Sequence, residues 1–246
     1  MLTLGIESSC DETAAAVIED GWRVRSSVVA SQVDLHAEYR GVVPELAGRE
    51  HVEKILPVVR SALREADVTI ADLGLIAVGH RPGLIGCLLV GLTAAKALVL
   101  ATGLPLVGVD HVHAHLYAPL LEVPAPDRPA FPALGLVVSG GHTSIYRVDS
   151  PVRVDRLGAT IDDAIGEAFA KAATLLGLPF PGGPNLDRLA SEDGANDRAF
   201  EFPISRIDPR SLDFSFSGLK TATMLAVRGD PRSEERRVGK ECRSRW

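Results

Sequence analysis

The chain has 246 residues, of which 46% are hydrophobic and 24% charged, with a formal net charge of −6. This composition is typical of one large or two small globular domains and gives no overall nucleic-acid footprint, so any RNA binding requires a local basic patch or a partner. The three cysteines have no paired spacing, and the N-terminus has no signal-peptide features. The chain also has no apolar run of transmembrane length that is free of Gly and charge. We therefore expect a reduced, cytoplasmic protein.

The first half predicts alternating strands and helices. Strands are expected at 2–8, 22–31, 73–79 and 105–109, with the second pairing with the preceding segment as a meander. A helix is expected at 44–66, kinked at Pro57, and a buried helix at 86–103, ending at Gly103. Asp110 occupies an N-cap position ahead of a further helix, "HVHAHLYAPLL".

A stretch with four prolines, "VPAPDRPAFPA" at 123–133, predicts a domain boundary. After it, a strand, a Gly turn and a second strand are expected over 133–148, and an amphipathic helix over 161–177. "LPFPGGPNLDRLA" then indicates a Pro/Gly loop that leads into a short helix. Both halves open with an apolar strand that runs into a small polar turn, so we expect two related domains, at 1–124 and 133–231.

The last segment, "RSEERRVGKECRSRW" at 232–246, has no apolar period and a sudden density of arginine. One back-translation of it matches a common short-read sequencing adapter. We interpret 232–246 as a non-native tail to be excluded from the fold, and expect the natural protein to continue beyond this point. The alternative is a natural basic tail.

Three histidines alternate in "VDHVHAHLYAP": His111, His113 and His115. On a helix only residues four apart share a face, so His111 and His115 pair and His113 points elsewhere, to the surface or to an outer position of the site. Such a pair supplies two ligands to Zn or Fe, and a third must come from elsewhere. The alternative is a histidine-rich helix start whose rings face solvent or are satisfied by neighbours.

Two acids, Asp11 and Glu12, follow the first strand, where α/β folds place ligands. A carboxylate there can orient a metal-bound group or accept a proton. The alternative is that the two acids cap a turn or a helix.

Three other stretches carry weaker signals. "VVSGGHT" can present backbone N–H groups to a phosphate, or can be a tight hairpin turn. In "PFPGGPNLDRLA", Asp187 can bind a ribose, or the segment can be a rigid connector. "DFSFSGLKTA" can be a strand with packed rings, and Lys220 can meet an anion, although core packing is the stronger interpretation.

Taken together and in order, these stretches resemble a known family. The motifs are "LGIESSCDETA", "GVVPELAGREHV", "PGLIGCLLVG", "HVHAHLYAP", "LVVSGGHT", "IDDAIGEAFAK", "GLPFPGGP" and "DFSFSGLKTA". They resemble the tRNA threonylcarbamoyladenosine biosynthesis transferases, formerly called O-sialoglycoprotein endopeptidases, across nearly all of residues 1–230. The resemblance implies an α/β, actin-like fold of two ribonuclease-H-type domains, the second incomplete in this chain.

The resemblance also implies a reaction and its site. A threonylcarbamoyl group passes from threonylcarbamoyl-adenylate to the exocyclic amine of the adenosine beside the tRNA anticodon, in tRNAs that read codons beginning with A. One divalent metal, Fe or Zn, is expected on His111 and His115, with Asp11 and Glu12 near the reaction centre. The donor-binding residues correspond to Val137, Val138, Ser139, Gly140 and Gly141, and the nucleoside side of the pocket to Gly183 and Asp187. The implied partners are tRNA, a paralogous non-catalytic subunit and a small ATPase subunit.

Three departures from the family pattern affect this expectation. Ala170 stands where the family usually has an Asp that contacts the nucleotide. Arg81, preceded by His80, replaces a small Gly before the Pro-Gly-Leu turn. The family continues past this chain, and the continuation carries a nucleotide-contacting Asn and the Asp that completes the metal site. We therefore expect this chain to be inactive alone.

Three alternative functions can be compared with the sequence. A metallopeptidase is disfavoured because the chain has no H-E-x-x-H motif. An actin-like kinase or ATPase would hydrolyse nucleotide without tRNA or a partner. A non-catalytic scaffold fits Ala170, whereas retention of both histidines disfavours it.

Overall fold

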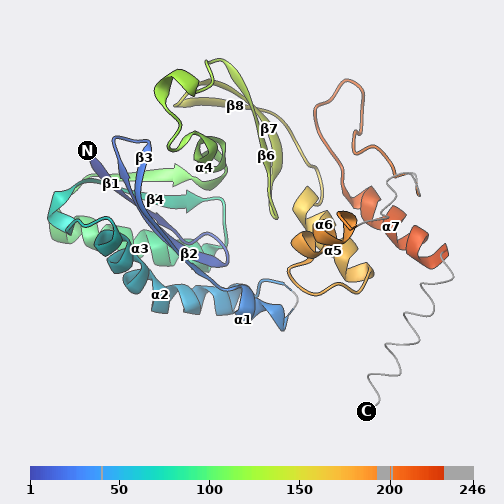
Figure 1. The fold of residues 1–246 in the computed structure, drawn as a ribbon, viewed down its shortest axis with the longest axis horizontal. Helices are drawn as coiled ribbons and strands as arrows, with labels where there is room; N and C mark the ends of the chain where they lie inside the picture. Colours follow the sequence, from blue (N-terminus) through green and yellow to red (C-terminus); the bar gives the residue numbers. More distant parts are fainter. Residues whose placement is uncertain (40, 193–199, 201, 230–246) are drawn as a thin grey trace, which may run out of the picture. The chain divides into compact units, whose positions relative to one another are not determined.

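The computed structural model describes residues 1–39, 41–192, 200 and 202–229 of the chain. Two compact units divide the chain, Met1–Ala130 and Phe131–Trp246, and the division falls within the proline-rich stretch at 123–133. Figure 1 shows the secondary-structure elements of each unit. The proposed non-native tail at 232–246 lies outside the described residues.

The first unit contains a five-stranded mixed sheet and its helices. In chain order these are β1 (Leu2–Glu7), β2 (Glu12–Glu19), β3 (Arg23–Ser31), α1 (Val33–Ala37), α2 (Pro44–Glu65), β4 (Leu73–Arg81), α3 (Ile85–Thr102), β5 (Leu106–Asp110) and α4 (His111–Tyr117). A strand or helix lies at each position predicted for this half, and β2 and α1 are additional elements, of which β2 separates the first and second predicted strands.

The strand order is β3-β2-β1-β4-β5. The first three strands form an antiparallel meander, so the expected pairing of 22–31 with the preceding segment is confirmed. Strands β4 and β5 run parallel to β1, which requires the long crossovers that α2 and α3 provide. This strand order, with these strand directions, agrees with the ribonuclease-H-type domain that the resemblance implies. The carboxyl ends of β1, β4 and β5 consequently meet at one edge of the sheet.

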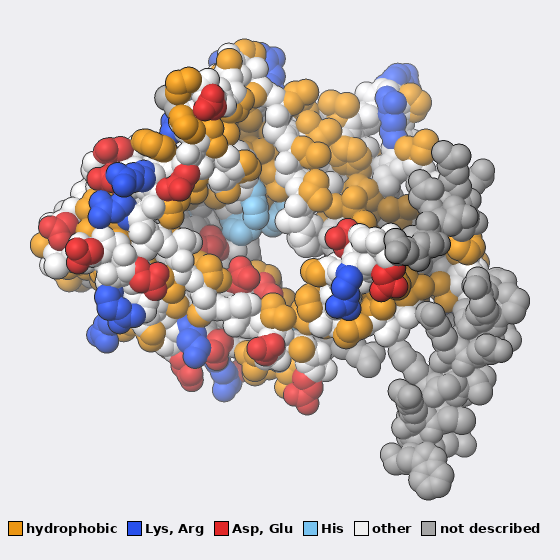
Figure 2. All heavy atoms as spheres, in the orientation of Figure 1, with side chains coloured by type: hydrophobic (Ala, Val, Ile, Leu, Met, Phe, Trp, Pro, Cys, Tyr) orange, Lys and Arg blue, Asp and Glu red, His pale blue; other side chains and the backbone are white. Residues whose placement is uncertain are grey.

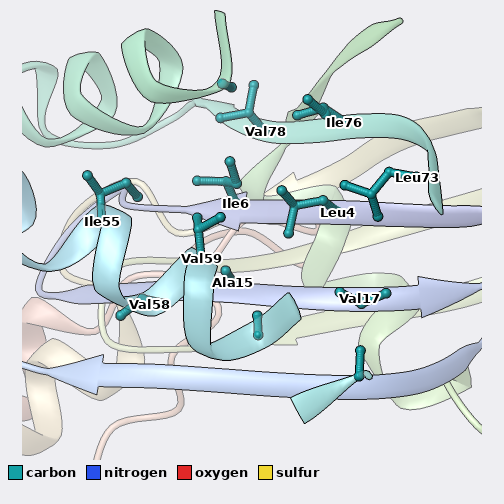
Figure 3. Close-up of a cluster of buried hydrophobic side chains, with 13 residues drawn as sticks. Leu4, Ile6, Ala15, Val17, Ile55, Val58, Val59, Leu73, Ile76 and Val78 are labelled. Atoms are coloured by element: carbon teal, nitrogen blue, oxygen red, sulfur yellow. The ribbon is translucent and has the colours of Figure 1, made fainter. Parts of the chain in front are cut away.

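The core lies between this sheet and α2 (Figure 3). Alternation along β1 turns Leu4 and Ile6 toward the helix, and Val59 of α2 packs from the other side. All three side chains are at most 4% exposed. Burial of each contributes about 1.5–3 kcal/mol, and this packing fixes β1, whose last residues enter the candidate site.

Helix α3 departs from the prediction of a buried helix. It ends at Gly103, which has φ 73° as expected of a C-cap glycine. Only one side of it is buried, however, and Ile85 and Leu100 are 78% and 90% exposed. Among the described helices, α3 is the one long and apolar enough to cross a membrane, by length and composition only. Its buried side packs on α2 and β4 of the same unit.

The second unit contains a three-stranded antiparallel sheet and three helices in its described residues. These are β6 (Ala133–Val138), β7 (Thr143–Ser150), β8 (Arg153–Ala159), α5 (Ile165–Leu175), α6 (Gly182–Ala190) and α7 (Ser217–Gly229), with the strands in the order β6-β7-β8. Like the first three strands of the first unit, these strands form an antiparallel meander, and the combination of sheets and helices in both units confirms the predicted α/β class. Hydrophobic side chains of this unit reach the surface (Figure 2), and Leu134 and Leu136 of β6 are 77% and 63% exposed.

Two predicted elements of this unit differ in the structure. Helix α5 begins at Ile165 rather than near residue 161 because the carboxylate of Asp162 accepts hydrogen bonds from the start of α7. The stretch at 213–222 is not a strand; it enters α7 at Ser217. The rings of Phe214 and Phe216 stack with centroids 5.9 Å apart, and Phe216 is buried, as the packing interpretation predicts.

Candidate functional site

The histidines of the opening motif lie on α4, as predicted. Asp110 is the N-cap, and its Oδ1 accepts hydrogen bonds from the backbone N of Val112 at 3.0 Å and of His113 at 3.2 Å. Helical geometry then places His111 and His115 on one face and turns His113 away from that face. The predicted pairing of His111 with His115 is therefore confirmed.

The two paired rings converge at their Nε2 atoms. His115 Nε2 lies 3.1 Å from His111 Nε2, with ring centroids 4.7 Å apart and ring planes at 86°. Two imidazole nitrogens that bind one Zn²⁺ at about 2.0–2.1 Å stand roughly 3 Å apart, so the pair fits the first two ligands of a metal. Across the described residues, no group of three or more His, Cys, Asp or Glu could hold a metal. Figure 2 shows histidine side chains together on the face that it views.

Glu7 and Ser9 hold the other nitrogen of His111. Glu7 Oε2 lies 3.4 Å from His111 Nδ1, and Ser9 Oγ lies 3.3 Å from the same atom. An Nδ1–H directed at the carboxylate leaves Nε2 as the unprotonated nitrogen of the ring, and a carboxylate behind the ring is the usual outer support of a metal-binding histidine.

The charges of this group shift the pKa values of its members. Burial raises the pKa of Glu7, but hydrogen bonds from His111 and Ser9 outweigh burial, and the net pKa is lowered. The hydrogen bond to Glu7 raises the pKa of His111, against the effect of burial. Burial and the neighbouring His111 lower the pKa of His115. An unprotonated His115 is the form that binds a metal.

The sequence analysis did not identify Glu7 as a site residue. It ends β1, at the edge where the carboxyl ends of β1, β4 and β5 meet. Gly79 of β4 makes room for it, because a Cβ there would overlap Glu7 Oε2. The sequence signal that could have identified Glu7 is an acid at the end of a buried apolar strand, next to "SSCDE".

The two predicted acids lie in the β1–β2 loop and at the start of β2. Asp11 is half-buried and Glu12 is exposed. Partial burial, followed by the negative charge of Asp11, raises the pKa of the neighbouring Cys10 thiol to about 12. The residues that directly contact the histidine pair are Glu7 and Ser9.

Arg81, the departure from the family pattern at the end of β4, faces the N-cap of α4. Its Nε lies 3.3 Å from Asp110 Oδ2, although its side chain is 69% exposed. The neighbouring His80 contacts the carbonyl of Val109 through Nδ1 at 3.0 Å. Both residues therefore contact the junction of β5 and α4, from which the histidine pair projects.

In the second unit, Ser139, Gly140 and Gly141 form the turn between β6 and β7. The N of Ser139 donates to the carbonyl of His142 at 2.8 Å, which closes a tight hairpin. Of the two preceding valines, Val137 is buried and Val138 is exposed. A Cβ added at Gly140 or Gly141 would meet no atom within 4 Å, so the turn is open to a ligand.

The start of α5 packs directly against this turn. The N of Gly166 donates to the carbonyl of Ser139 at 3.2 Å, and a Cβ at Gly166 would come within 2.6 Å of that oxygen. The turn and the positive end of a helix are therefore adjacent, an arrangement that favours an anion.

The remaining predicted residues lie on α6. Gly182 is buried, and a Cβ on it would lie 2.9 Å from the Cα of Ala170. Gly183 has open space around its Cα, and Asp187, one turn later, is exposed. Ala170 thus lies beside the start of α6, where the family's usual Asp would extend.

Sequence reasoning also missed Asp162. Its two oxygens accept hydrogen bonds from Ser215 Oγ, Ser217 Oγ and the backbone N of Phe216 and Ser217, at 2.5–3.2 Å. These bonds outweigh desolvation and lower the pKa of Asp162 to about 2. The acid joins "IDDAIGEAFAK" to "DFSFSGLKTA", two motifs that lie more than 50 residues apart.

Comparison with known proteins gives a consistent result. Residues 23–240 match the family model described as "TsaD: tRNA N6-adenosine threonylcarbamoyltransferase". The protein of that name from Trichlorobacter lovleyi is 56% identical over 235 residues, 96% of this chain and 67% of the relative. The one from Protochlamydia amoebophila is 50% identical over 233 residues, 95% of this chain and 66% of the relative.

The chain thus spans about two thirds of the length of these curated relatives. Among solved structures, component A of (R)-2-hydroxyglutaryl-CoA dehydratase from Acidaminococcus fermentans matches 94% of this chain and 70% of its own, with a TM-score of 0.47 and 12% identity. The family match and the sequence identities over nearly the whole chain lead to one conclusion: the chain belongs to the tRNA N6-adenosine threonylcarbamoyltransferase family.

Proposed function

We propose that this protein transfers a threonylcarbamoyl group from threonylcarbamoyl-adenylate to the exocyclic amine of the adenosine beside the anticodon, in tRNAs that read codons beginning with A. The observation that carries the proposal is the convergence of His111 Nε2 and His115 Nε2 at 3.1 Å, with Glu7 behind His111, in a chain of this family.

His111 and His115 would hold one divalent metal ion, Fe or Zn, and its remaining protein ligand would come from outside the described residues. When bound, the metal supplies a Lewis acid that polarises the donor and accommodates developing negative charge. Glu7 and Ser9 keep the ring of His111 oriented, and the Asp110 cap fixes the start of its helix.

The other residues bind the donor and move a proton. The turn formed by Ser139, Gly140 and Gly141 holds the phosphate of the adenylate with its backbone N–H groups, flanked by Val137 and Val138. Gly183 and Asp187 contact the nucleoside. The amine nitrogen of the tRNA attacks the carbamoyl carbon, Asp11 or Glu12 accepts the proton, and the bond to the phosphate oxygen breaks to release AMP.

Partners and location follow the same proposal. A net charge of −6 gives the chain little intrinsic attraction for tRNA, so a paralogous non-catalytic subunit and a small ATPase subunit would complete the tRNA-binding assembly in the cytoplasm. Because tRNA binding depends on these partners in this proposal, the chain alone is proposed to be inactive.

Metal content provides the first test. After loading with Zn²⁺ or Fe²⁺ and desalting, we expect one metal per chain by elemental mass spectrometry. His111→Ala and His115→Ala should lose it, whereas His113→Ala, on the same helix but off the shared face, should retain it. Equal retention in all three variants would refute the proposed metal site.

Transfer provides the second test. The chain, both partner subunits, synthetic threonylcarbamoyl-adenylate and a tRNA transcript are incubated, and the digested nucleosides are analysed by mass spectrometry. We expect the modified adenosine with the wild-type chain in the complete mixture and not with His111→Ala. Donor binding without any transfer would indicate a non-catalytic scaffold. ATP hydrolysis by the chain without tRNA would indicate an actin-like ATPase or kinase.

A further inference from the structure

Three parts of the first unit fix the loop that joins β1 to β2, residues 8–11. Ser8 Oγ donates to the carbonyl of Cys87 at 2.9 Å and accepts from the N of Gly91 at 3.1 Å, both on α3. The carbonyl of Ser9 accepts from the N of Leu84 at 2.8 Å. The loop therefore leaves β1 with its backbone held by the segment around the start of α3.

The next two carbonyls are held by other parts of the unit. His51 Nε2, on α2, lies 3.0 Å from the carbonyl oxygen of Cys10. The carbonyl of Asp11 accepts from the N of Gln32, after β3, at 3.0 Å. Of the groups that hold the three consecutive carbonyls of Ser9, Cys10 and Asp11, His51 is the one side chain; the others are backbone N–H groups. Among the contacts to these carbonyls, it is therefore the one that a substitution can remove.

The protonation of His51 follows from its partners. A carbonyl oxygen can only accept, so Nε2 carries the proton and donates to Cys10. In the neutral ring Nδ1 is then an acceptor, and Thr13 Oγ1, 2.7 Å away, donates to it. His51 and Thr13 are both 0% exposed, so both ring nitrogens are satisfied within the protein and the ring has one orientation and one tautomer.

We propose that His51 is a positioning residue for the reaction: it holds the Cys10 carbonyl so that the side chains of Asp11 and Glu12 are presented to substrate from a rigid loop. This inference rests on the proposed function, because the acids that it positions are those proposed there to move the proton. Residues of a reactive site must be held to within a fraction of an ångström by such outer contacts. The buried ring of His51 on α2, with a hydrogen bond at each of its two nitrogens, provides that constraint.

Cys10 reports on the loop without any catalysis. Its thiol reaches solvent, yet partial burial and the charge of Asp11 raise its pKa to about 12 from the usual 9. If the loop is released, that pKa falls toward 9. The thiolate population at fixed pH then rises by up to about 1000-fold, whereas the alkylation rate of each thiolate falls by roughly 30-fold because a thiolate of lower pKa is less nucleophilic. Full release therefore raises the alkylation rate by about 30-fold.

Two substitutions separate the roles of the two ring nitrogens. The amide of glutamine reaches the position of Nε2, so His51→Gln keeps a donor for the Cys10 carbonyl. The amide of asparagine reaches only the position of Nδ1, so His51→Asn keeps the hydrogen bond to Thr13 and loses the hydrogen bond to the Cys10 carbonyl. Val59→Ala, a core truncation on the same helix, controls for lost stability without touching the loop.

The experiment is iodoacetamide labelling of the folded chain at pH 8, with peptide mass spectrometry to separate Cys10 from Cys87 and Cys242. We expect His51→Asn to label Cys10 at least tenfold faster than wild type, and His51→Gln and Val59→Ala to stay within about threefold. A wild-type rate in His51→Asn would overturn the proposal. So would an equal acceleration in Val59→Ala, since that would indicate general opening of the unit.

Transfer kinetics of the complete assembly then connect the loop to the reaction. We expect His51→Asn to lower kcat with little change in KM for the donor, and His51→Gln to restore most of kcat. Asp11→Asn and Glu12→Gln test the proposed function separately. If neither alters transfer while His51→Asn still accelerates labelling, the assigned role of the acids is wrong although His51 does hold the loop. An unchanged kcat in His51→Asn would overturn the positioning role.

Discussion

Substitution of Glu7 tests the support of the histidine pair. Glu7 Oε1 accepts a hydrogen bond from the N of Ser9 at 2.5 Å, and Glu7 Oε2 lies 3.4 Å from His111 Nδ1. A carboxylate accepts at both oxygens, whereas a glutamine amide has one oxygen and must turn its NH2 group toward one of the two donors. We therefore expect Glu7→Gln to weaken metal binding as much as Glu7→Ala does, although it is nearly isosteric.

The magnitude follows from the contact that is lost. A hydrogen bond to a charged acceptor contributes about 1.5–3 kcal/mol. The 3.4 Å separation from His111 is longer than an ideal bond, which favours the lower part of that range, about 1.5–2 kcal/mol. At about 1.4 kcal/mol per tenfold change, we expect Zn²⁺ to bind roughly 10- to 30-fold more weakly, as for other outer partners of metal-binding histidines.

The assay is a competition titration of Zn²⁺ against a fluorescent chelator of known affinity. His113→Ala serves as the control on the same helix and should change the Kd by less than about twofold. The reasoning would be refuted if Glu7→Gln bound Zn²⁺ within threefold of wild type while His111→Ala abolished binding, since His111 would then need no carboxylate behind it.

Three further substitutions test the other contacts. Asp162→Ala removes the cap of α7, a contact that contributes about 1 kcal/mol, and should lower Tm by about 2–4 °C at pH 7. Folding lowers the pKa of Asp162 from 3.8 to about 2, so this contribution is complete above pH 3.8 and is lost as the pH falls through 2. The melting temperatures of wild type and variant should therefore converge in acid. Gly166→Ala places a Cβ within 2.6 Å of the Ser139 carbonyl and should cost about 1–3 kcal/mol in urea denaturation and weaken binding of an adenylate analogue; unchanged affinity would separate the turn from donor binding. Arg81→Gly removes an exposed ion pair to Asp110 and should cost no more than about 1 kcal/mol, less at high salt; a loss above 2 kcal/mol would contradict this estimate.

Local rules made part of the site predictable. The N-cap role of Asp110 and the pairing of His111 with His115 depend on the geometry of one helix and need no distant residue. The glycine that ends α3, Gly103, is predictable for the same reason, because only its own backbone conformation matters. The order of the motifs further indicated the family before any contact was known.

Longer-range features required the tertiary structure. Glu7 lies 104 positions before His111, and only the parallel pairing of β1, β4 and β5 brings the ends of their strands together. The start of α5 was misplaced because Asp162 binds α7 instead of continuing a helix. The sequence by itself determined the periodic elements and their caps, since hydrophobic alternation and capping act within a few residues; the tertiary structure decided which acid supports which histidine, because that depends on distances between chain segments far apart in sequence.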